Sequence, residues 1–252
     1  MGSRTKIYFA SDIHLGSDFF EDTRVVEKRF IRWLESIRPD AKALFLLGDV
    51  FDYWFEYKYV VPKGFTRFLG KIAEMTDEGI EVHFFVGNHD IWAFDYLPKE
   101  TGIILHTREC ITEIYGKKLF LAHGDGLGDD SKSFRLIRSV FHNKVCQKMY
   151  SWIHPRWSIA FAHRWSRHSR KEGLSEITPG YLGEDKEHLV QFAKQYLRQN
   201  SDIDFFVFGH RHIMLDLMIN KQSRVLILGD WLQHFSYAVL NEAGEMELTV
   251  FE

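Results

Sequence analysis

Short runs of large apolar residues recur along the chain without polar alternation, which is the pattern of β-strands buried on both faces. The six runs cover Ile7 to Ala10, Ala43 to Leu47, Val82 to Val86, Leu119 to Ala122, Phe205 to Phe208 and Val225 to Leu228. In residues 25–37 and 65–75, which lie between the first three runs, apolar residues instead recur every three or four positions, as on one face of a helix. The β-α-β-α-β order predicts a layered α/β fold whose first half is a largely parallel sheet.

Two later regions depart from this rhythm. Tyr237 to Leu240 and Met246 to Phe251 flank a turn-forming segment and predict an antiparallel hairpin. In residues 131–185, helical periodicity runs from Phe134 to Trp152, stops at a proline and resumes from Trp157 to Trp165. Because this segment is too long for a plain connection, we expect one domain over residues 1–252 with a helical insertion, a cap, at 131–185.

Composition narrows the class of protein. The 252 residues are 45% hydrophobic and 27% charged, which is typical of a globular domain with a substantial core. Two cysteines cannot build a disulfide framework or a thiolate zinc site. No apolar run approaches the eighteen residues of a membrane span and no signal peptide is evident, so a cytoplasmic protein is expected.

Charge is distributed unevenly. Residues 131–171 contain ten Lys or Arg and no Asp or Glu, although the whole chain has a formal net charge of -3. The predicted insertion is therefore a basic segment on an acidic body, suited to an anionic partner.

Polar residues follow five of the apolar strands directly. These segments are Ser11-Asp12-Ile13-His14, Gly48-Asp49-Val50-Phe51-Asp52, Gly87-Asn88-His89-Asp90, His123-Gly124-Asp125 and Gly209-His210-Arg211-His212. Because the carboxyl ends of strands in an open α/β sheet form the crevice where ligands bind, the five segments are expected to converge.

The donors in these segments are carboxylate, amide and imidazole groups, with no thiolate, which suits divalent Mn, Fe, Zn or Mg. Asp12 and His14 are two residues apart, as are His210 and His212, so strand alternation would point each pair to one side. The glycines let the backbone approach a bound group closely. Each motif alone is an ordinary turn or cap, but five in this order predict a centre with enough donors for two ions sharing a carboxylate.

Together these motifs resemble the calcineurin-like metallophosphoesterase superfamily over residues 12 to 212. The resemblance implies one metal held by Asp12, His14, Asp49 and His212, and a second held by Asp49, Asn88, His123 and His210. Asp49 would then bridge the two ions. Asp52 and Asp90 would orient ligands, or alternatively cap a following helix.

Hydrolysis of a phosphate ester or anhydride is the chemistry that such a pair of ions supports, because they acidify a water and neutralise the phosphoryl oxygens. Asn88 and His89 are the expected catalytic residues. His89, beside a ligand, is the candidate for protonating the leaving oxygen or stabilising charge on the transferred group.

The insertion bears on the substrate. Its basic side chains could neutralise a pyrophosphate while its aromatic residues offer apolar surface, which together favour an amphiphilic anion. A solvated basic face over a core-facing stripe, an anchor on anionic lipid and a nucleic-acid patch are the alternatives.

The motif His123-Gly124-Asp125-x-Leu127, with the residues that follow it, the basic insertion and the late Leu228-Gly229-x-Trp231, is similar to the UDP-2,3-diacylglucosamine hydrolases of lipid A biosynthesis. That similarity implies cleavage of a nucleotide-sugar lipid to UMP and 2,3-diacylglucosamine 1-phosphate, typically with Mn. It also implies peripheral association with the anionic cytoplasmic face of the inner membrane, with no nucleic acid and no obligate protein partner. The substrate contacts that it implies are His89, Asp130, Arg135, Ser169 and Arg170.

One departure keeps a second function open. That family commonly has Gly-Asn-Arg-Asp where this chain has His89. A relative acting on another nucleotide pyrophosphate or phosphodiester is the alternative enzyme, and a non-catalytic metal-bearing interaction scaffold is the alternative class.

Overall fold

Two β-sheets form the centre of the molecule. The structure is a computed structural model and describes residues 4–128, 139–160, 180–200 and 202–252. The first sheet has the order β11-β10-β1-β2-β3-β4, in which β1 to β4 are parallel and β10 is antiparallel to β1. Its strands are β1 (Lys6–Ala10), β2 (Ala41–Leu47), β3 (Glu81–Phe85), β4 (Ile104–His106), β10 (Ser236–Leu240) and β11 (Met246–Val250).

The second sheet has the order β5-β6-β7-β9-β8, with a parallel centre and an antiparallel strand at each edge. Its strands are β5 (Cys110–Ile114), β6 (Lys117–Leu121), β7 (Phe205–Phe208), β8 (Met214–Met218) and β9 (Arg224–Leu228). All six predicted strands and the predicted hairpin are confirmed, whereas β4, β5 and β8, which are short or half-exposed, were not predicted.

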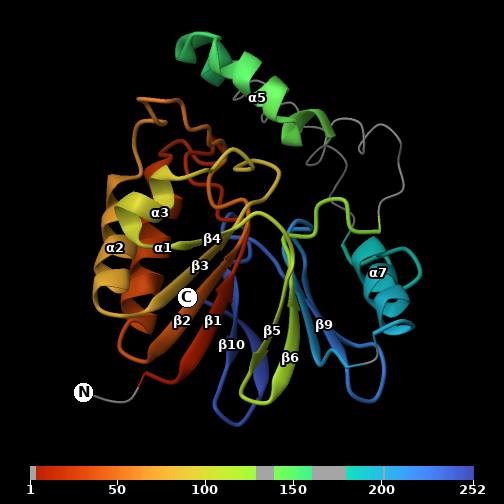
Figure 1. The fold of residues 1–252 in the computed structure, drawn as a ribbon. Helices are drawn as coiled ribbons and strands as arrows, with labels where there is room; N and C mark the ends of the chain where they lie inside the picture. The colour runs from red at the N-terminus through yellow and green to blue at the C-terminus, as the bar shows by residue number, and fades with distance from the viewer. Residues whose placement is uncertain (1–3, 129–138, 161–179, 201) are drawn as a thin grey trace.

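Helices cover the outer face of each sheet (Figure 1). The first sheet carries α1 (Arg24–Ile37), α2 (Thr66–Asp77) and α3 (Tyr96–Thr101), and the second carries α7 (His188–Leu197). The order of layers is therefore helix, sheet, sheet, helix, which confirms the layered α/β sandwich. The α1 and α2 helices form where the 3.6-residue apolar period predicted them.

Alternating side chains of each central strand enter different cores. Ile7 and Phe9 of β1 pack between the sheets, while Tyr8 and Ala10 pack against the helices. A strand that is covered on both sides needs apolar residues at every position, which explains the unbroken runs in the sequence. This rigid double layer fixes where each strand ends.

The helix side of the first sheet contains a cluster of large aromatic rings. Trp231, three residues beyond the end of β9, is fully buried with its ring 4.7 Å from that of Phe30 and 5.0 Å from that of Trp33. Its indole N–H has no hydrogen-bond partner among the described residues. Its backbone N–H donates to the carbonyl of Asp12 at 3.0 Å, so the core is joined directly to a candidate ligand.

The described part of the insertion lies at the carboxyl ends of the strands (Figure 1). The predicted helix from Phe134 to Trp152 is not continuous. Residues 139–142 are helical, Asn143 has extended backbone, and its side chain accepts N–H bonds from Val145 and Cys146 to begin α5 (Lys144–Ser151). An asparagine at such a position competes with the helix and caps the next one, which the apolar period alone could not reveal.

Apolar side chains of the insertion remain open to solvent. Trp152 is 76% exposed and Trp157 is 69% exposed, and Val145, Met149 and Ile153 are exposed as well. The reading of this stripe as a core-facing one is therefore wrong for these residues. We call these five residues the insertion patch.

Truncation of Trp231 tests the aromatic cluster. We expect Trp231→Ala to lower the free energy of unfolding by about 3–5 kcal/mol because it leaves a large cavity. Trp231→Phe should cost markedly less, since it keeps most contacts and removes a buried N–H without a partner. Urea unfolding followed by far-UV circular dichroism measures both values, and equal losses in the two variants would contradict this account of the cluster.

Candidate metal centre

The loops that follow β1, β2, β3, β6 and β7 meet at one point, as predicted. Ligand atoms lie within 4.8 Å of one another in three overlapping groups. The groups are Asp12 with His14 and His212, His14 with Asp49 and His89, and Asp12 with Asp49 and His123. Since these residues are up to two hundred positions apart in sequence, only the sandwich fold assembles them.

Left-handed backbone sets the direction of these side chains. Asp12, His14, Asp49, His210 and His212 all have φ between 48° and 69°. The strands β1 and β7 end at Ala10 and Phe208, before the candidate ligands, so the prediction that strand alternation aligns each pair is wrong. Residues other than glycine rarely adopt this conformation, and such strain clusters at functional sites.

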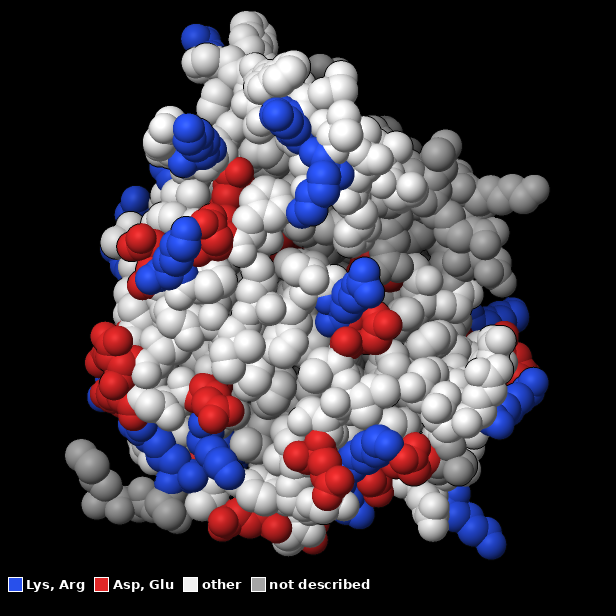
Figure 2. All heavy atoms as spheres, in the orientation of Figure 1, with Lys and Arg blue, Asp and Glu red and all other residues white. Residues whose placement is uncertain are grey.

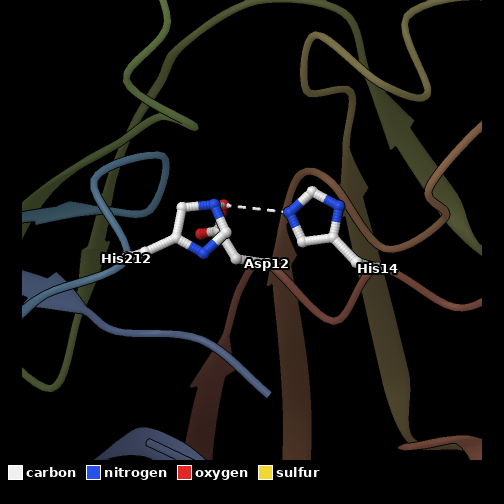
Figure 3. Close-up of side chains that lie close together, drawn as sticks. All are labelled: Asp12, His14 and His212. Carbon is white, nitrogen blue, oxygen red and sulfur yellow. Dashed lines mark ion pairs between the residues drawn. The ribbon is translucent and has the colours of Figure 1, made fainter. Parts of the chain in front are cut away.

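Asp12 lies between two imidazoles (Figure 3). Its Oδ1 is 3.8 Å from Nε2 of His14 and 3.5 Å from Nε2 of His212. Its Oδ2 accepts hydrogen bonds from the Ser11 hydroxyl at 2.7 Å and the His210 backbone at 2.8 Å. One oxygen of the carboxylate is thus fixed by the protein and the other faces the centre.

Asp49 occupies the middle of the cluster. Its Oδ2 lies 3.3 Å from Nε2 of His123 and 3.9 Å from Nε2 of His14, and its Oδ1 accepts the His89 N–H at 2.9 Å. Burial opposes ionisation, but His123 and the other imidazoles outweigh it and hold the pKa of Asp49 well below its usual range. This carboxylate is therefore ionised and lies between His14 and His123.

His123 and Asn88 lie together on the other side of Asp49. The Nδ1–H of His123 donates to the Leu47 carbonyl at 2.8 Å, and its Nε2 is 3.3 Å from Oδ1 of Asn88. Burial lowers the pKa of His123 but the Asp49 carboxylate raises it well above its ordinary value. This arrangement aims Nε2 into the cluster.

His210 lies beside this pair but in none of the three close groups. Its ring is 5.2 Å from that of His123, and burial together with the neighbouring His123 charge lowers its pKa well below the ordinary value. A buried neutral imidazole next to a ligand pair is the form that binds a metal ion.

Asp52 and Asp90 hold the loops around the cluster. Asp90 accepts N–H bonds from Val50 at 2.8 Å and Gly87 at 2.7 Å, which ties the loop after β2 to the loop after β3. Burial and the Asp49 charge raise the pKa of Asp90 to about 7.

The Asp52 carboxylate lies 3.6 Å from Nδ1 of His14. Neither Asp52 nor Asp90 begins a helix, because α2 and α3 follow Phe65 and Asp95, so the alternative as helix caps is wrong.

The donor set fits divalent cations. Oδ1 of Asp12 and Nε2 of His14 are buried and face each other, yet neither has a hydrogen-bond partner among the described residues. Two buried polar atoms without partners are costly, and a cation between them would satisfy both. Carboxylate, amide and imidazole ligands without a thiolate match Mn, Fe, Zn or Mg, as the sequence predicted.

Sequence reasoning missed one residue in contact with this cluster. Asp230 follows strand β9 and its Oδ2 lies 3.2 Å from Nδ1 of His212. The sequence did contain a signal for this residue. Gly229 and Asp230 directly follow a predicted strand, just as Gly48 and Asp49 do.

A hollow opens beside His123. The residues that line it include Gly87, Gly124, Asp125, Thr107, Arg108 and His142. Of the expected substrate contacts, His89 lies at the cluster, whereas Asp130, Arg135, Ser169 and Arg170 lie outside the described residues.

The fold and the cluster together define an α/β sandwich with a candidate metal site of carboxylates and imidazoles at the carboxyl ends of its strands. The chain belongs to the calcineurin-like phosphoesterase family, whose model matches residues 5–214. This confirms the family resemblance found in the sequence motifs.

Particular relatives share almost the whole chain. The UDP-2,3-diacylglucosamine hydrolase of Porphyromonas gingivalis is 46% identical over 246 residues, with 94% of each chain covered. The enzyme of the same name from Neisseria meningitidis serogroup A is 28% identical over 92% of this chain and 91% of the relative. Among solved structures, a dimetal phosphatase from Danio rerio covers 99% of both chains with a TM-score of 0.47 and 12% identity.

Gly87 tests the close packing of the cluster. A Cβ at Gly87 would lie 2.2 Å from Oδ1 and 2.5 Å from the backbone nitrogen of Asp49. We therefore expect Gly87→Ala to displace Asp49 and to lower Mn affinity by at least tenfold, measured by calorimetric titration.

Gly70 provides the matched control. It lies within α2, and a Cβ there would meet nothing within 4 Å. Gly70→Ala should leave Mn affinity unchanged and raise stability by about 0.5–1 kcal/mol. Unaltered Mn affinity in Gly87→Ala would show that the Asp49 position is not constrained as described.

Proposed function

We propose that this protein hydrolyses the pyrophosphate of UDP-2,3-diacylglucosamine to UMP and 2,3-diacylglucosamine 1-phosphate. The observation that carries the proposal is the gathering of Asp12, His14, Asp49, His123 and His212 in one buried cluster. The 46% identity to a UDP-2,3-diacylglucosamine hydrolase over 94% of both chains supports the choice of substrate. An anhydride of two phosphates is a substrate on which divalent cations held by such a cluster can act.

In this proposal the first cation is held by Asp12, His14, Asp49 and His212, and the second by Asp49, Asn88, His123 and His210. The central position of Asp49 between His14 and His123 supports its role as the shared ligand. Bound divalent cations, most simply Mn, would supply neutralisation of the phosphoryl oxygens and acidification of the attacking water.

His89 acts on the substrate as a proton donor or charge stabiliser. Its Nδ1 donates to the Asp52 carbonyl at 2.9 Å, because a carbonyl can only accept. The second nitrogen, Nε2, is then the one that exchanges a proton with the leaving oxygen, and protonated His89 donates there. The His89 side chain is 17% exposed and that of His212 is 32% exposed, so both remain reachable by substrate.

The insertion patch supports an amphiphilic substrate held at a membrane surface. It stands at the same end of the molecule as the metal centre, and in Figure 2 the uppermost part of this face shows Lys and Arg without Asp or Glu. Exposed tryptophan and methionine beside basic residues suit acyl chains and anionic headgroups. No helix of the described residues is long and apolar enough to cross a bilayer. From the insertion patch and the lipid named in the relatives' activity, we place the protein in the cytoplasm, peripherally on the inner membrane, with the insertion as a cap over the acyl chains.

His89 favours one alternative, which is hydrolysis of another nucleotide pyrophosphate or phosphodiester. Imidazole in place of the arginine common among the lipid enzymes changes how the transferred group is contacted.

Incubation of the purified protein with Mn and UDP-2,3-diacylglucosamine separates these activities, with UMP measured by chromatography. We expect UMP release that disappears with chelator and returns with Mn. Turnover of UDP-glucose with none of the lipid substrate would instead support the alternative enzyme.

Variants of Asp49 and His89 separate metal binding from catalysis. Asp49→Ala should remove both metals and all activity, because it deletes the shared ligand. His89→Ala should retain both metals and slow turnover by about 10²–10⁴-fold, the usual contribution of a general acid. Metal content is measured by elemental analysis and turnover by UMP release. Asp216→Asn, which alters a surface carboxylate paired with Arg224, is the control and should match the parent. A metal-loaded parent protein inert on every phosphodiester and pyrophosphate would support the interaction scaffold.

A further inference from the structure

A carboxylate outside the predicted ligand set contacts one of its imidazoles. Asp230 begins the loop after β9, and its Oδ2 lies 3.2 Å from Nδ1 of His212. Both groups are near the metal centre, and the Asp230 side chain is only 3% exposed. A carboxylate can only accept here, so Nδ1 of His212 carries the proton.

The other nitrogen of His212 faces the cluster. Nε2 lies 3.5 Å from the unpartnered Oδ1 of Asp12, and the ring planes of His212 and His14 are nearly parallel, with centroids 5.1 Å apart (Figure 3). A proton at Nδ1 leaves Nε2 with a lone pair, which is the form that coordinates a cation.

The backbone holds Asp230 firmly in this orientation. Its Oδ1 accepts N–H bonds from Leu232 at 3.1 Å, Gln233 at 2.7 Å and His234 at 3.0 Å. The ring nitrogen Nδ1 of His234 lies a further 3.4 Å from the same oxygen. With Oδ1 occupied by three donors, Oδ2 is the oxygen left for His212.

The same loop also reaches the second ligand on this side. The backbone N–H of Trp231 donates to the carbonyl of Asp12 at 3.0 Å, and the Trp231 ring is fixed in the aromatic cluster. The loop at residues 230–231 thus contacts Asp12 and His212. By contrast, the Nδ1–H of His123, on the other side, donates to the Leu47 carbonyl.

We propose that Asp230 is a positioning residue that keeps His212 in the tautomer protonated at Nδ1 and so presents Nε2 to the cation shared with Asp12, His14 and Asp49. Asp230 therefore affects the affinity for that cation and does not affect the affinity for the cation held by Asn88, His123 and His210. The proposal rests on the metal centre of the proposed function.

Asparagine at this position tests the tautomer directly. The three backbone donors would retain the amide oxygen at the Oδ1 position, which turns the amide NH₂ toward His212. Two donors cannot share a hydrogen bond, so His212 would have to accept at Nδ1 and carry its proton on Nε2. The side-chain volume hardly changes, yet the metal-facing lone pair is lost.

The experiment is a titration of metal-free full-length protein with Mn, followed by calorimetry and electron paramagnetic resonance. The parent should bind two ions and show the spectrum of a spin-coupled Mn pair. Asp230→Asn should keep one tight ion, bind the other about 10–100-fold more weakly and show the spectrum of isolated Mn. Asp216→Asn serves as the control and should keep the coupled pair.

A double variant shows whether Asp230 acts through His212. If it does, adding Asp230→Asn to His212→Gln should weaken Mn binding no further. Thermal unfolding of the metal-free proteins separates a folding defect from a change in metal affinity, and we expect similar midpoints for the parent and Asp230→Asn.

The outcomes distinguish this proposal from the proposed function. Two tightly bound, coupled ions in Asp230→Asn would overturn the role of Asp230 while leaving the metal centre intact, as would additive losses in the double variant. A parent protein that binds fewer than two ions would overturn the metal centre and this proposal with it.

Discussion

Buried acidic oxygens at the ends of parallel strands are the constraint on which this molecule depends. Asp12 and Asp49 lie at the edge of an apolar double sheet, where an isolated carboxylate is expensive. Hydrogen bonds from fixed donors offset part of this desolvation penalty; on Asp12 they come from the Ser11 hydroxyl and the His210 backbone N–H. The remaining oxygens face imidazoles whose Nε2 atoms are themselves electron-pair donors. A divalent cation would satisfy both sets at once.

Backbone hydrogen bonds between loops keep these donors in register. The N–H of Asp12 binds the Gly48 carbonyl at 3.1 Å, and the N–H of Gly209 binds the His123 carbonyl at 2.9 Å. Each bond connects the end of one strand to the end of a neighbour. Such hydrogen bonds to neighbouring loops stabilise the left-handed residues in their strained conformation.

The sequence predicted the elements of this fold well where burial is complete. The six apolar runs and the two periodic helices appear because covering both faces of a sheet leaves no choice of residue. It also predicted that Asp12, His14, Asp49, Asn88, His123 and His212 gather. The route by which they do so was not predicted, since alternation along a strand says nothing about residues beyond its end. Left-handed conformations at Asp12 and His210 depend on tertiary contacts.

The insertion was harder to predict because only some of its apolar residues, such as Phe141, pack against the rest of the protein, whereas the insertion patch does not. A period of three or four residues marks a helix with one apolar face, but not what that face meets. Asn143 breaks the first helix, and the insertion patch stays exposed. The sequence pattern predicts the surroundings of an apolar face only where that face packs against other residues of the same chain.

Contacts at both ends of the insertion lead to the metal loops. Near its start, the Trp92 indole N–H donates to the Phe141 carbonyl at 3.0 Å, and Trp92 follows His89 by three residues. Beyond its end, Glu187 accepts both bonds of the Arg211 Nε–H at 3.0 and 3.2 Å, and Arg211 stands between His210 and His212. Glu187 is buried, so this charged pair is held in one geometry. In the proposed function, a ligand that engages the insertion would therefore act on the loop that carries His89, which would join recognition of an apolar tail to the site of phosphoryl chemistry.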